Sequence, residues 1–214
     1  MQLYFSPLAC SMASRIALAE AGGAVKAIEV DPHTKRVLAT GEDYHAIYPL
    51  GLVPALRLDD GSLLTENAAI LQYIADEHPE SGLAPPASQR VERAKLQQWL
   101  SFIGSELHKA LFVPLLDRTA ASEAKTRTAE KGRTRLDYLN KHLEGRDTIL
   151  DRFTIADAYL VTVLNWTQAT PQIDLGAYPA LKSYLDRMRR RPSVAKALGV
   201  EAPLYQAEMA RRAA

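Results

Sequence analysis

Residues 4–11, Tyr-Phe-Ser-Pro-Leu-Ala-Cys-Ser, decide how the fold of this chain begins. A short apolar strand is broken by Ser6-Pro7, and apolar residues then recur at helical spacing up to Ala21. Cys10, the only cysteine, therefore falls at the predicted start of a helix. Unpaired backbone N–H groups and the positive end of the helix dipole favour a thiolate at such a position. A small buried hydrophobe is the structural alternative, and position alone does not separate the two.

Composition excludes several classes of function. The 214 residues are 47% hydrophobic and 24% charged, as expected of an ordinary globular protein. Lys plus Arg (26) nearly balance Asp plus Glu (25), so no global charge points to nucleic acid or to an acidic membrane. One cysteine permits no internal disulfide, which suits a reducing compartment. The N-terminus does not read as a signal peptide, and no stretch reads as a membrane span. We expect a cytoplasmic protein with neither a nucleic-acid nor a membrane partner.

The first eighty residues alternate strand and helix signals. The predicted elements are a strand at 3–5, a helix at 11–21 ended by Gly22-Gly23, a strand at 25–30, and a hairpin at 55–58 and 62–64. Asp-Gly at 60–61 supplies the turn of that hairpin. Thr65-Glu66-Asn67 is expected to cap a further helix. This order predicts a small α/β domain.

The second half of the chain carries only helical patterns. Proline, glycine and serine gather at 79–88, which predicts an interdomain linker between an α/β domain at 1–78 and an all-helical domain at 89–214. The predicted helices are 91–111, 122–143, 155–168 and 181–191, followed by a short tail. Thr154 and Asp157 read as an acidic capping box for the third of these helices.

Taken together, these segments resemble a cytosolic glutathione transferase, most closely the bacterial beta class, whose members carry a cysteine in the first turn of the first helix. The resemblance covers nearly the whole chain. It rests on Ser6-Pro7-x-x-Cys10-Ser11, Leu52-Val53-Pro54-Ala55-Leu56, Leu64-Thr65-Glu66-Asn67-x-Ala69-Ile70, Trp99-x-x-Phe102-x-x-Ser105-Glu106-x-His108-Lys109 and Phe153-Thr154-x-Ala156-Asp157-Ala158. It implies an N-terminal thioredoxin-like domain that binds glutathione and a C-terminal helical-bundle domain that contributes the site for an electrophile.

The resemblance assigns three segments of the N-terminal domain to glutathione. Leu52, Val53 and Pro54 form a loop with a cis-proline, in which the Val53 backbone pairs with the cysteinyl main chain of the ligand. Glu66 and Asn67 open a helix whose N-terminus receives a carboxylate. A plain helix cap is the alternative there, and Asn67 departs from the small residue common in the family.

Lys35 lies where the family places a basic residue against the glycyl carboxylate of glutathione. A solvated loop around His33, Lys35 and Arg36 explains the same residues equally well.

Further residues are assigned to the thiolate of glutathione and its surroundings. Cys10, Ser11 and His108 are the catalytic candidates. Ser105, His108 and Lys109 are expected to share one helix face, because they are three and four positions apart. A surface or otherwise satisfied histidine is the alternative for His108, and Ser101 stands where the family often has asparagine. Glu106 is expected to face a partner subunit, near the ammonium group of the ligand.

The function that follows is conjugation of reduced glutathione to soft hydrophobic electrophiles by a homodimer, with glutathione as co-substrate and no other cofactor. The histidines and the cysteine show no metal-ligand spacing. Two alternatives stay open. Cys10 could carry out glutathione-dependent thiol–disulfide exchange, although Ala13 stands where a dithiol enzyme has its second cysteine. The chain could also bind hydrophobic ligands without catalysis.

Overall fold

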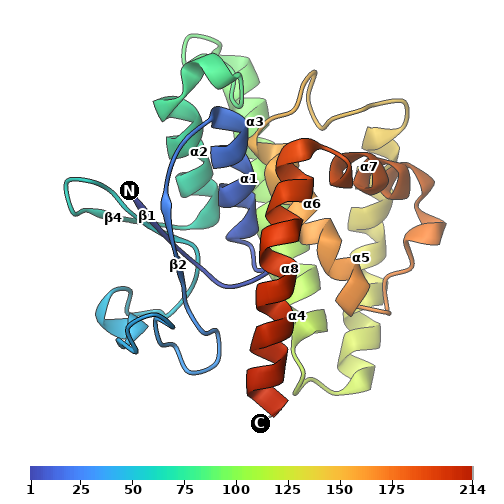
Figure 1. Cartoon of the computed structure of the whole chain (residues 1–214). Coiled ribbons are helices and arrows are strands. Elements are labelled where there is room, and N and C mark those ends of the chain that lie inside the picture. The colour runs from blue at the N-terminus through green and yellow to red at the C-terminus, as the bar shows by residue number, and fades with distance from the viewer. Residues whose placement is uncertain (214) are drawn as a thin grey trace. The chain divides into compact units, whose positions relative to one another are not determined.

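A computed structural model describes residues 1–213, which form two compact units. The first comprises Met1–Leu83 and the segment that begins at Pro192, and the second is Ala84–Arg191. The first unit is built on a four-stranded sheet in the order β2-β1-β3-β4 (Figure 1). Its strands are β1 (Gln2–Phe5), β2 (Lys26–Glu29), β3 (Ala55–Arg57) and β4 (Leu63–Thr65). β1 and β2 are parallel, whereas β3 is antiparallel to both β1 and β4.

The predicted α/β pattern of this unit is confirmed. Its helices are α1 (Met12–Ala21), α2 (Asn67–Glu77) and α8 (Pro192–Ala213), with short 3₁₀ turns η1 (Tyr44–Ala46) and η2 (Pro79–Ser81). Gly22 ends α1 in the left-handed conformation, with its N–H bonded to the Leu18 carbonyl. Gly61 has a φ of +87° in the turn of the hairpin, as the Asp-Gly pair predicts.

The core of the sheet is apolar along its central strands. Leu3 of β1 and Leu56 of β3 face each other in the register and are fully buried. Tyr4 packs against Tyr44, with ring centroids 5.4 Å apart. α1 and α2 pack against each other, and the residues that α2 buries are apolar apart from Asn67 at its start. Burial of these side chains is the main force that holds the sheet and helices together.

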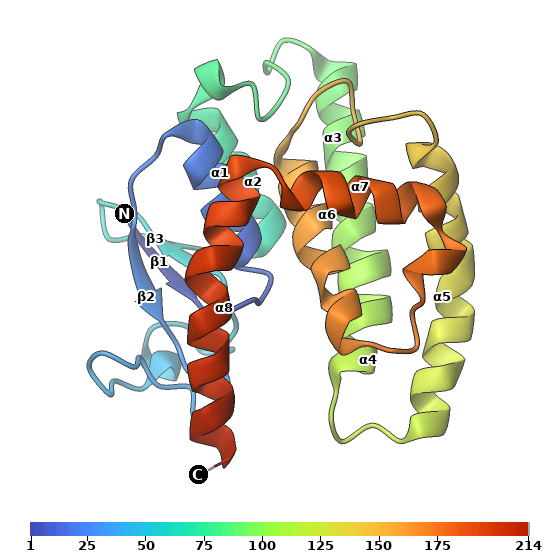
Figure 2. The same cartoon turned by 45° about the vertical axis from the view of Figure 1, so that its right-hand side comes forward.

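The last helix departs from the sequence prediction. Where a short tail of the helical domain was expected, α8 runs for 22 residues and packs on α1 of the first unit (Figure 2). Pro203 lies inside α8, which explains why the sequence pattern reads as interrupted. Buried polar contacts accompany this packing, including a hydrogen bond from Ser193 to Glu20. The segment predicted as 89–214 is therefore divided at Pro192 in the structure.

The second unit is all-helical, as predicted. It contains α3 (Arg90–Phe102), η3 (Ile103–Phe112), α4 (Val113–Leu116), α5 (Ser122–Leu143), α6 (Ile155–Asn165), η4 (Trp166–Ala169), η5 (Leu175–Ala177) and α7 (Pro179–Arg189). The bounds of α5 match the predicted helix at 122–143. The helix predicted at 91–111 is continuous in the chain but changes type, because η3 is a ten-residue π-helix. The N–H of Val113 bonds to the His108 carbonyl five residues earlier, as a π-helix requires.

Asp157 organises the start of α6, which is buried along its whole length. The predicted capping box is present, and the Asp157 carboxylate accepts from the Thr154 N–H at 2.9 Å. It also accepts from the Ile149 N–H at 2.9 Å and from the Tyr184 hydroxyl at 3.0 Å. Burial raises the pKa of Asp157 to about 6, so the side chain is still ionised at pH 7. One carboxylate thus joins α6, α7 and the loop before α6.

We predict that Asp157→Ala destabilises the protein strongly, because four buried donors, including the Thr154 hydroxyl, lose a charged acceptor. The expected loss in the free energy of unfolding is at least about 3 kcal/mol, measured by urea denaturation at pH 7. Asp174→Ala is the matched control, since Asp174 caps η5 on the surface through the Gly176 N–H and its loss should cost about 1 kcal/mol. Equal losses in the two variants would contradict the organising role of Asp157.

Candidate active site

Four chain segments converge at one end of the sheet because of the way the strands pair. β1 and β2 are parallel, so the segments that follow them leave from the same end. β3 runs the other way and begins there, with Ala55 paired to Tyr4. β4 ends there, with Thr65 paired to Ala55. The predicted site residues on these segments are Cys10 after β1, Lys35 after β2, Leu52, Val53 and Pro54 before β3, and Glu66 and Asn67 after β4.

The thiol of Cys10 points at the loop before β3. The Val53–Pro54 peptide bond is cis, as the resemblance implied. The Cys10 thiol donates to the Val53 carbonyl, with Sγ and O 3.2 Å apart. Cys10 precedes α1, and its own carbonyl accepts from the Ala13 N–H at 3.1 Å. The thiol therefore lies both at the N-terminus of α1 and beside the backbone of Val53.

Tyr44 supports this loop through a hydrogen bond, and it was not identified from the sequence. Its ring is fully buried, and its hydroxyl donates to the Leu52 carbonyl at 2.9 Å. Burial raises the pKa of Tyr44, so the hydroxyl keeps its proton as a donor. The Leu52 side chain is exposed. The only signal in the sequence was a tyrosine in an irregular segment, which does not indicate a partner.

The Ser11 side chain bonds to the backbone of the turn between β1 and α1. Its side chain is fully buried, and Oγ donates to the Ser6 carbonyl at 3.2 Å. Ser6 in turn donates to the Val30 carbonyl at 2.7 Å. These two serines fasten the turn between β1 and α1. Of the two side chains predicted to stabilise a thiolate here, Cys10 is the one that reaches the cis-proline loop.

The start of α2 carries no side-chain cap, which corrects the prediction from Thr65-Glu66-Asn67. Glu66 is exposed and has a left-handed φ of +66°. Asn67 is buried, with its Oδ1 accepting from Ser14 Oγ at 3.3 Å. Within residues 1–213, Asn67 Nδ2 is buried without a hydrogen-bond partner. The N–H groups of the first turn thus keep the donor capacity that an anion would use.

Lys35 also occupies a left-handed position, with a φ of +56°. Its N–H bonds to the Asp31 carbonyl, and the Asp31 carboxylate accepts from the N–H groups of His33 and Thr34 at 2.8 and 2.9 Å. Burial lowers the pKa of Lys35, and the negative charge of Asp31 opposes that effect. The segment after β2 is therefore a structured turn, in which His33 and Arg36 are exposed.

The remaining predicted site residues lie in the second unit, on η3. His108 is buried, with Nδ1 2.7 Å from the Tyr159 hydroxyl and its ring edge-on to Trp166. Burial lowers the pKa of His108 to about 4, with a smaller contribution from Lys109, so the ring is neutral at pH 7. Tyr159 and Trp166 were not identified from the sequence.

The expectation that Ser105, His108 and Lys109 share a face is wrong. Ser105 and Lys109 are exposed while His108 is buried with Leu107, Leu111 and Phe112. Ser105 Oγ donates to the Ser101 carbonyl at 2.9 Å. Glu106 forms an ion pair with Arg135 of α5, with Oε2 and Nε 2.6 Å apart.

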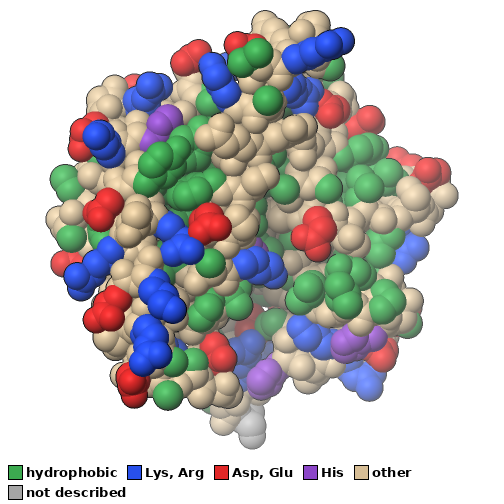
Figure 3. Space-filling model, turned by 180° about the vertical axis from the view of Figure 1, so that it is seen from behind, with side chains coloured by type: hydrophobic (Ala, Val, Ile, Leu, Met, Phe, Trp, Pro, Cys, Tyr) green, Lys and Arg blue, Asp and Glu red, His purple; other side chains and the backbone are tan. Residues whose placement is uncertain are grey.

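The face drawn in Figure 3 shows no single dominant charge. On the face in Figure 3, side chains of Lys and Arg are interspersed with those of Asp and Glu. Among the described residues, no group of three or more His, Cys, Asp or Glu side chains is arranged to hold a metal ion. None of the described helices is long and apolar enough to cross a membrane.

Comparisons with known proteins place this chain in a family. A family model described as glutathione S-transferase, N-terminal domain, matches residues 9–77, and its C-terminal counterpart matches residues 105–192. Glutathione S-transferase GstA of Escherichia coli O157:H7 is 43% identical over 94% of this chain and 98% of its own length. The chain belongs to the glutathione S-transferase family.

Solved structures of glutathione S-transferases agree with this membership. A sphingomonad glutathione S-transferase complexed with glutathione is 46% identical, with a TM-score of 0.88 over 94% of this chain and 99% of that one. A bacterial beta class enzyme from Sphingomonas chungbukensis is 45% identical, with a TM-score of 0.88 over 94% of this chain and 98% of that one. The resemblance to the bacterial beta class is thereby confirmed.

We predict a pH dependence of stability that arises from His108. Unfolded histidine binds a proton below its ordinary pKa of 6.5, whereas folded His108 does so only near pH 4. Its neutral form therefore contributes stability that is complete above pH 6.5 and is lost as the pH falls toward 4. The free energy of unfolding should drop by about 3 kcal/mol across that range through this residue.

Urea denaturation between pH 4 and 7 checks this, with His108→Phe compared with the natural chain. The variant should lose that part of the pH dependence, while the control His33→Gln, at an exposed position, should keep it. Parallel pH profiles for the natural chain and His108→Phe would contradict the assignment.

Proposed function

We propose that this chain is a glutathione transferase that binds reduced glutathione at the converging segments of its first unit and conjugates it to soft, hydrophobic electrophiles. The observation that carries the proposal is the contact of the Cys10 thiol with the Val53 carbonyl at the cis Val53–Pro54 bond. It puts a sulfur-handling group beside the backbone of the loop before β3, which is what a cysteine-containing peptide needs. Membership of the family supports the same reading.

Each part of glutathione has a counterpart among the site residues. The Val53 backbone pairs with the cysteinyl main chain, which brings the ligand's sulfur close to Cys10. The first turn of α2 receives a carboxylate, with Glu66 orienting the approach and the Asn67 Nδ2 donor close by. Lys35 lies after β2, on the other side of β1 from this loop, and offers a cation to the glycyl carboxylate. Lowering the pKa of the glutathione thiol is the main catalytic device, because the thiolate is the nucleophile.

We also propose roles for residues of η3 in the second unit. His108 is neutral at pH 7, so it acts through hydrogen bonding rather than through charge. Ser105 and Lys109 are exposed and remain available to a ligand. Glu106 is proposed to meet the ammonium group of glutathione bound to a second subunit of a homodimer. Its ion pair with Arg135 fixes its orientation and also competes for its charge.

Thiol–disulfide exchange through Cys10 is the second candidate function, and the same contact favours it. The Cys10 sulfur attacks one sulfur of oxidised glutathione, a Cys10–glutathione disulfide forms, and one glutathione leaves as a thiolate that takes up a proton. Cys10 is the group for this chemistry, because it is the one cysteine of the chain. The thiol of a second, reduced glutathione then attacks the glutathione sulfur of the mixed disulfide, oxidised glutathione leaves, and Cys10 takes up the proton as its thiol is regenerated.

We predict that Cys10 forms a mixed disulfide with glutathione and is dispensable for conjugation. Incubation with oxidised glutathione should add one glutathione to the intact mass, reversibly by reductant, and Cys10→Ala should show no adduct. Because glutathione brings its own sulfur, Cys10→Ala should keep measurable conjugation of an activated aryl halide.

The two assays separate the candidate functions. Loss of conjugation in folded Cys10→Ala, at unchanged glutathione affinity, would show that Cys10 is essential to the transfer step. A natural chain that neither conjugates nor exchanges but still binds aryl compounds would be a non-catalytic binder.

We also predict a homodimer in which Glu106 contributes to glutathione affinity. Sedimentation at micromolar concentration should give twice the chain mass of 23.6 kDa, and a monomer would contradict the assembly. Glu106→Gln should weaken glutathione binding by about 1.5 kcal/mol, the low end for a charge-assisted bond because Glu106 is partly exposed. Calorimetry measures this, with Glu130→Gln on α5 as the surface control. An unchanged glutathione affinity would contradict the role of Glu106 without contradicting the homodimer.

A further inference from the structure

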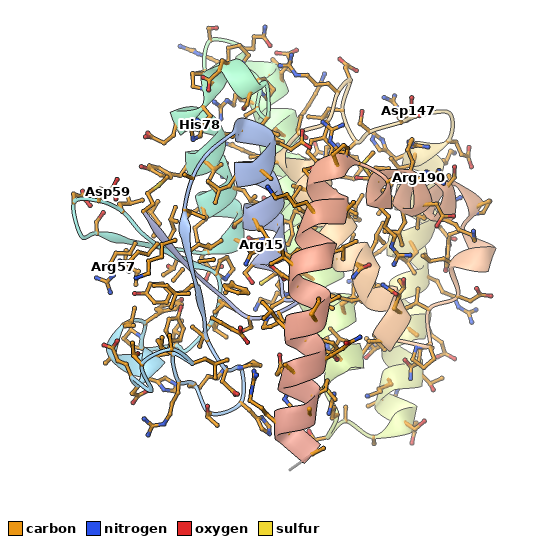
Figure 4. All side chains as sticks on the ribbon, in the orientation of Figure 1. Arg15, Arg57, Asp59, His78, Asp147 and Arg190 are labelled. Atoms are coloured by element: carbon orange, nitrogen blue, oxygen red, sulfur yellow. The ribbon has the colours of Figure 1, made fainter. Side chains whose placement is uncertain are left out.

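Glu201 of α8 connects three elements of the first unit. Its side chain is fully buried, and its two oxygens bind different partners. Oε2 accepts from the Leu8 N–H at 2.8 Å, and Oε1 accepts from Arg15 Nε at 2.7 Å. Arg15 lies on α1 beside α8, with its guanidinium 4.5 Å from the centre of the Phe5 ring (Figure 4). One carboxylate from the last helix is thus bonded to the loop that leads to Cys10.

Leu8 has an unusual backbone conformation. Its φ is +55°, in the left-handed region that residues with a Cβ atom rarely adopt. Such a conformation persists only where surrounding contacts hold it. Leu8 lies two residues before Cys10, inside the turn in which the Ala9 N–H bonds to the Ser6 carbonyl at 3.1 Å. The direction in which the chain arrives at Cys10 therefore depends on the φ of Leu8.

We propose that Glu201 is a positioning residue for Cys10: it holds Leu8 in the left-handed conformation and so aims the thiol at the Val53 carbonyl. The proposal rests on the proposed function only in taking Cys10 as the reactive group. A purely structural role, in which Glu201 and Arg15 merely attach α8 to α1, makes a different prediction. The two roles can be separated because the loop and the arginine use different oxygens.

Alkylation of Cys10 by iodoacetamide, followed by intact mass on the full chain, measures the placement of the thiol. Cys10 is 9% exposed and hydrogen-bonded, which limits access of the reagent. Glu201→Met removes the acceptor for Leu8, and alkylation should become about tenfold faster as the loop relaxes. Glu201→Gln keeps an amide oxygen for the Leu8 N–H and should stay near the natural rate.

Glu208→Met is the matched control on the same helix. Glu208 is also buried and forms an ion pair with Arg212 at 2.6 Å. Among the described residues, it forms no hydrogen bond or ion pair with the Cys10 loop. Its loss should lower stability without changing the alkylation rate. Equal rates in Glu201→Met and Glu208→Met would overturn the proposal.

Substitutions at Leu8 test the same claim with the ion pair intact, and they serve if Glu201→Met fails to fold. Valine resists a positive φ, so Leu8→Val should speed alkylation, whereas Leu8→Gly accepts that φ and should not. In the Glu201→Met background, Leu8→Gly should bring the rate back toward the natural one. If the ion pair were purely structural, Leu8→Gly would not restore the alkylation rate in the Glu201→Met background.

Alkylation needs no glutathione, so these results can be read whatever the chain's activity. A normal glutathione adduct together with an unchanged alkylation rate in Glu201→Met and Leu8→Val would overturn the positioning role and leave the proposed function standing. If the glutathione adduct fails to form but the alkylation rates follow the expected pattern, the positioning role of Glu201 stands and thiol exchange with glutathione is contradicted.

Discussion

The antiparallel pairing of β3 with β1 is the constraint on which the site depends. With Ala55 opposite Tyr4, the loop that precedes β3 meets the loop that follows β1 at one end of the sheet. The hydrogen bond from the Cys10 thiol to the Val53 carbonyl is a direct result of that register. A shift of one residue would turn Leu3 and Leu56 out of the core, so the hydrophobic pattern protects the register and, with it, the site.

Buried polar groups fasten the loops around this register. Tyr44 holds the Leu52 carbonyl, Ser11 holds Ser6, and Glu201 holds Leu8. Each bond gives a backbone group of a loop a side-chain partner, because an unpaired buried group is costly. Among the described residues of the first unit, the buried side-chain atoms that stay unpaired are Asn67 Nδ2 and Arg15 Nη2. The hydrogen-bonded loops maintain the geometry of the site, and the N–H groups in the first turn of α2 remain available as donors.

Much of the fold followed from the sequence because its signals are local. Gly22 and the Asp-Gly turn at 60–61 end and join elements through their own backbone preferences, and α5 has both its bounds as predicted. The π-helix could not be predicted, because its buried positions also suit an ordinary helix. His108 was grouped with Ser105 and Lys109 by spacing alone, and spacing does not show which of the three is buried. The length of α8 was missed because Pro203 interrupts its helical pattern. Glu201 lies on α8, so its buried position was not predicted either.

The candidate site was predictable where a residue type carries its own chemistry, as Cys10 does. Partners separated by long stretches of chain, such as Leu8 and Glu201, leave no signal in a single sequence. The central claim is that the Val53 edge and Cys10 together receive glutathione. A crystal structure of the chain grown with reduced glutathione tests it most directly. The account predicts the cysteinyl main chain of the tripeptide paired with the Val53 backbone and its sulfur beside Cys10. A tripeptide bound elsewhere, with the Cys10–Val53 contact undisturbed, would contradict it.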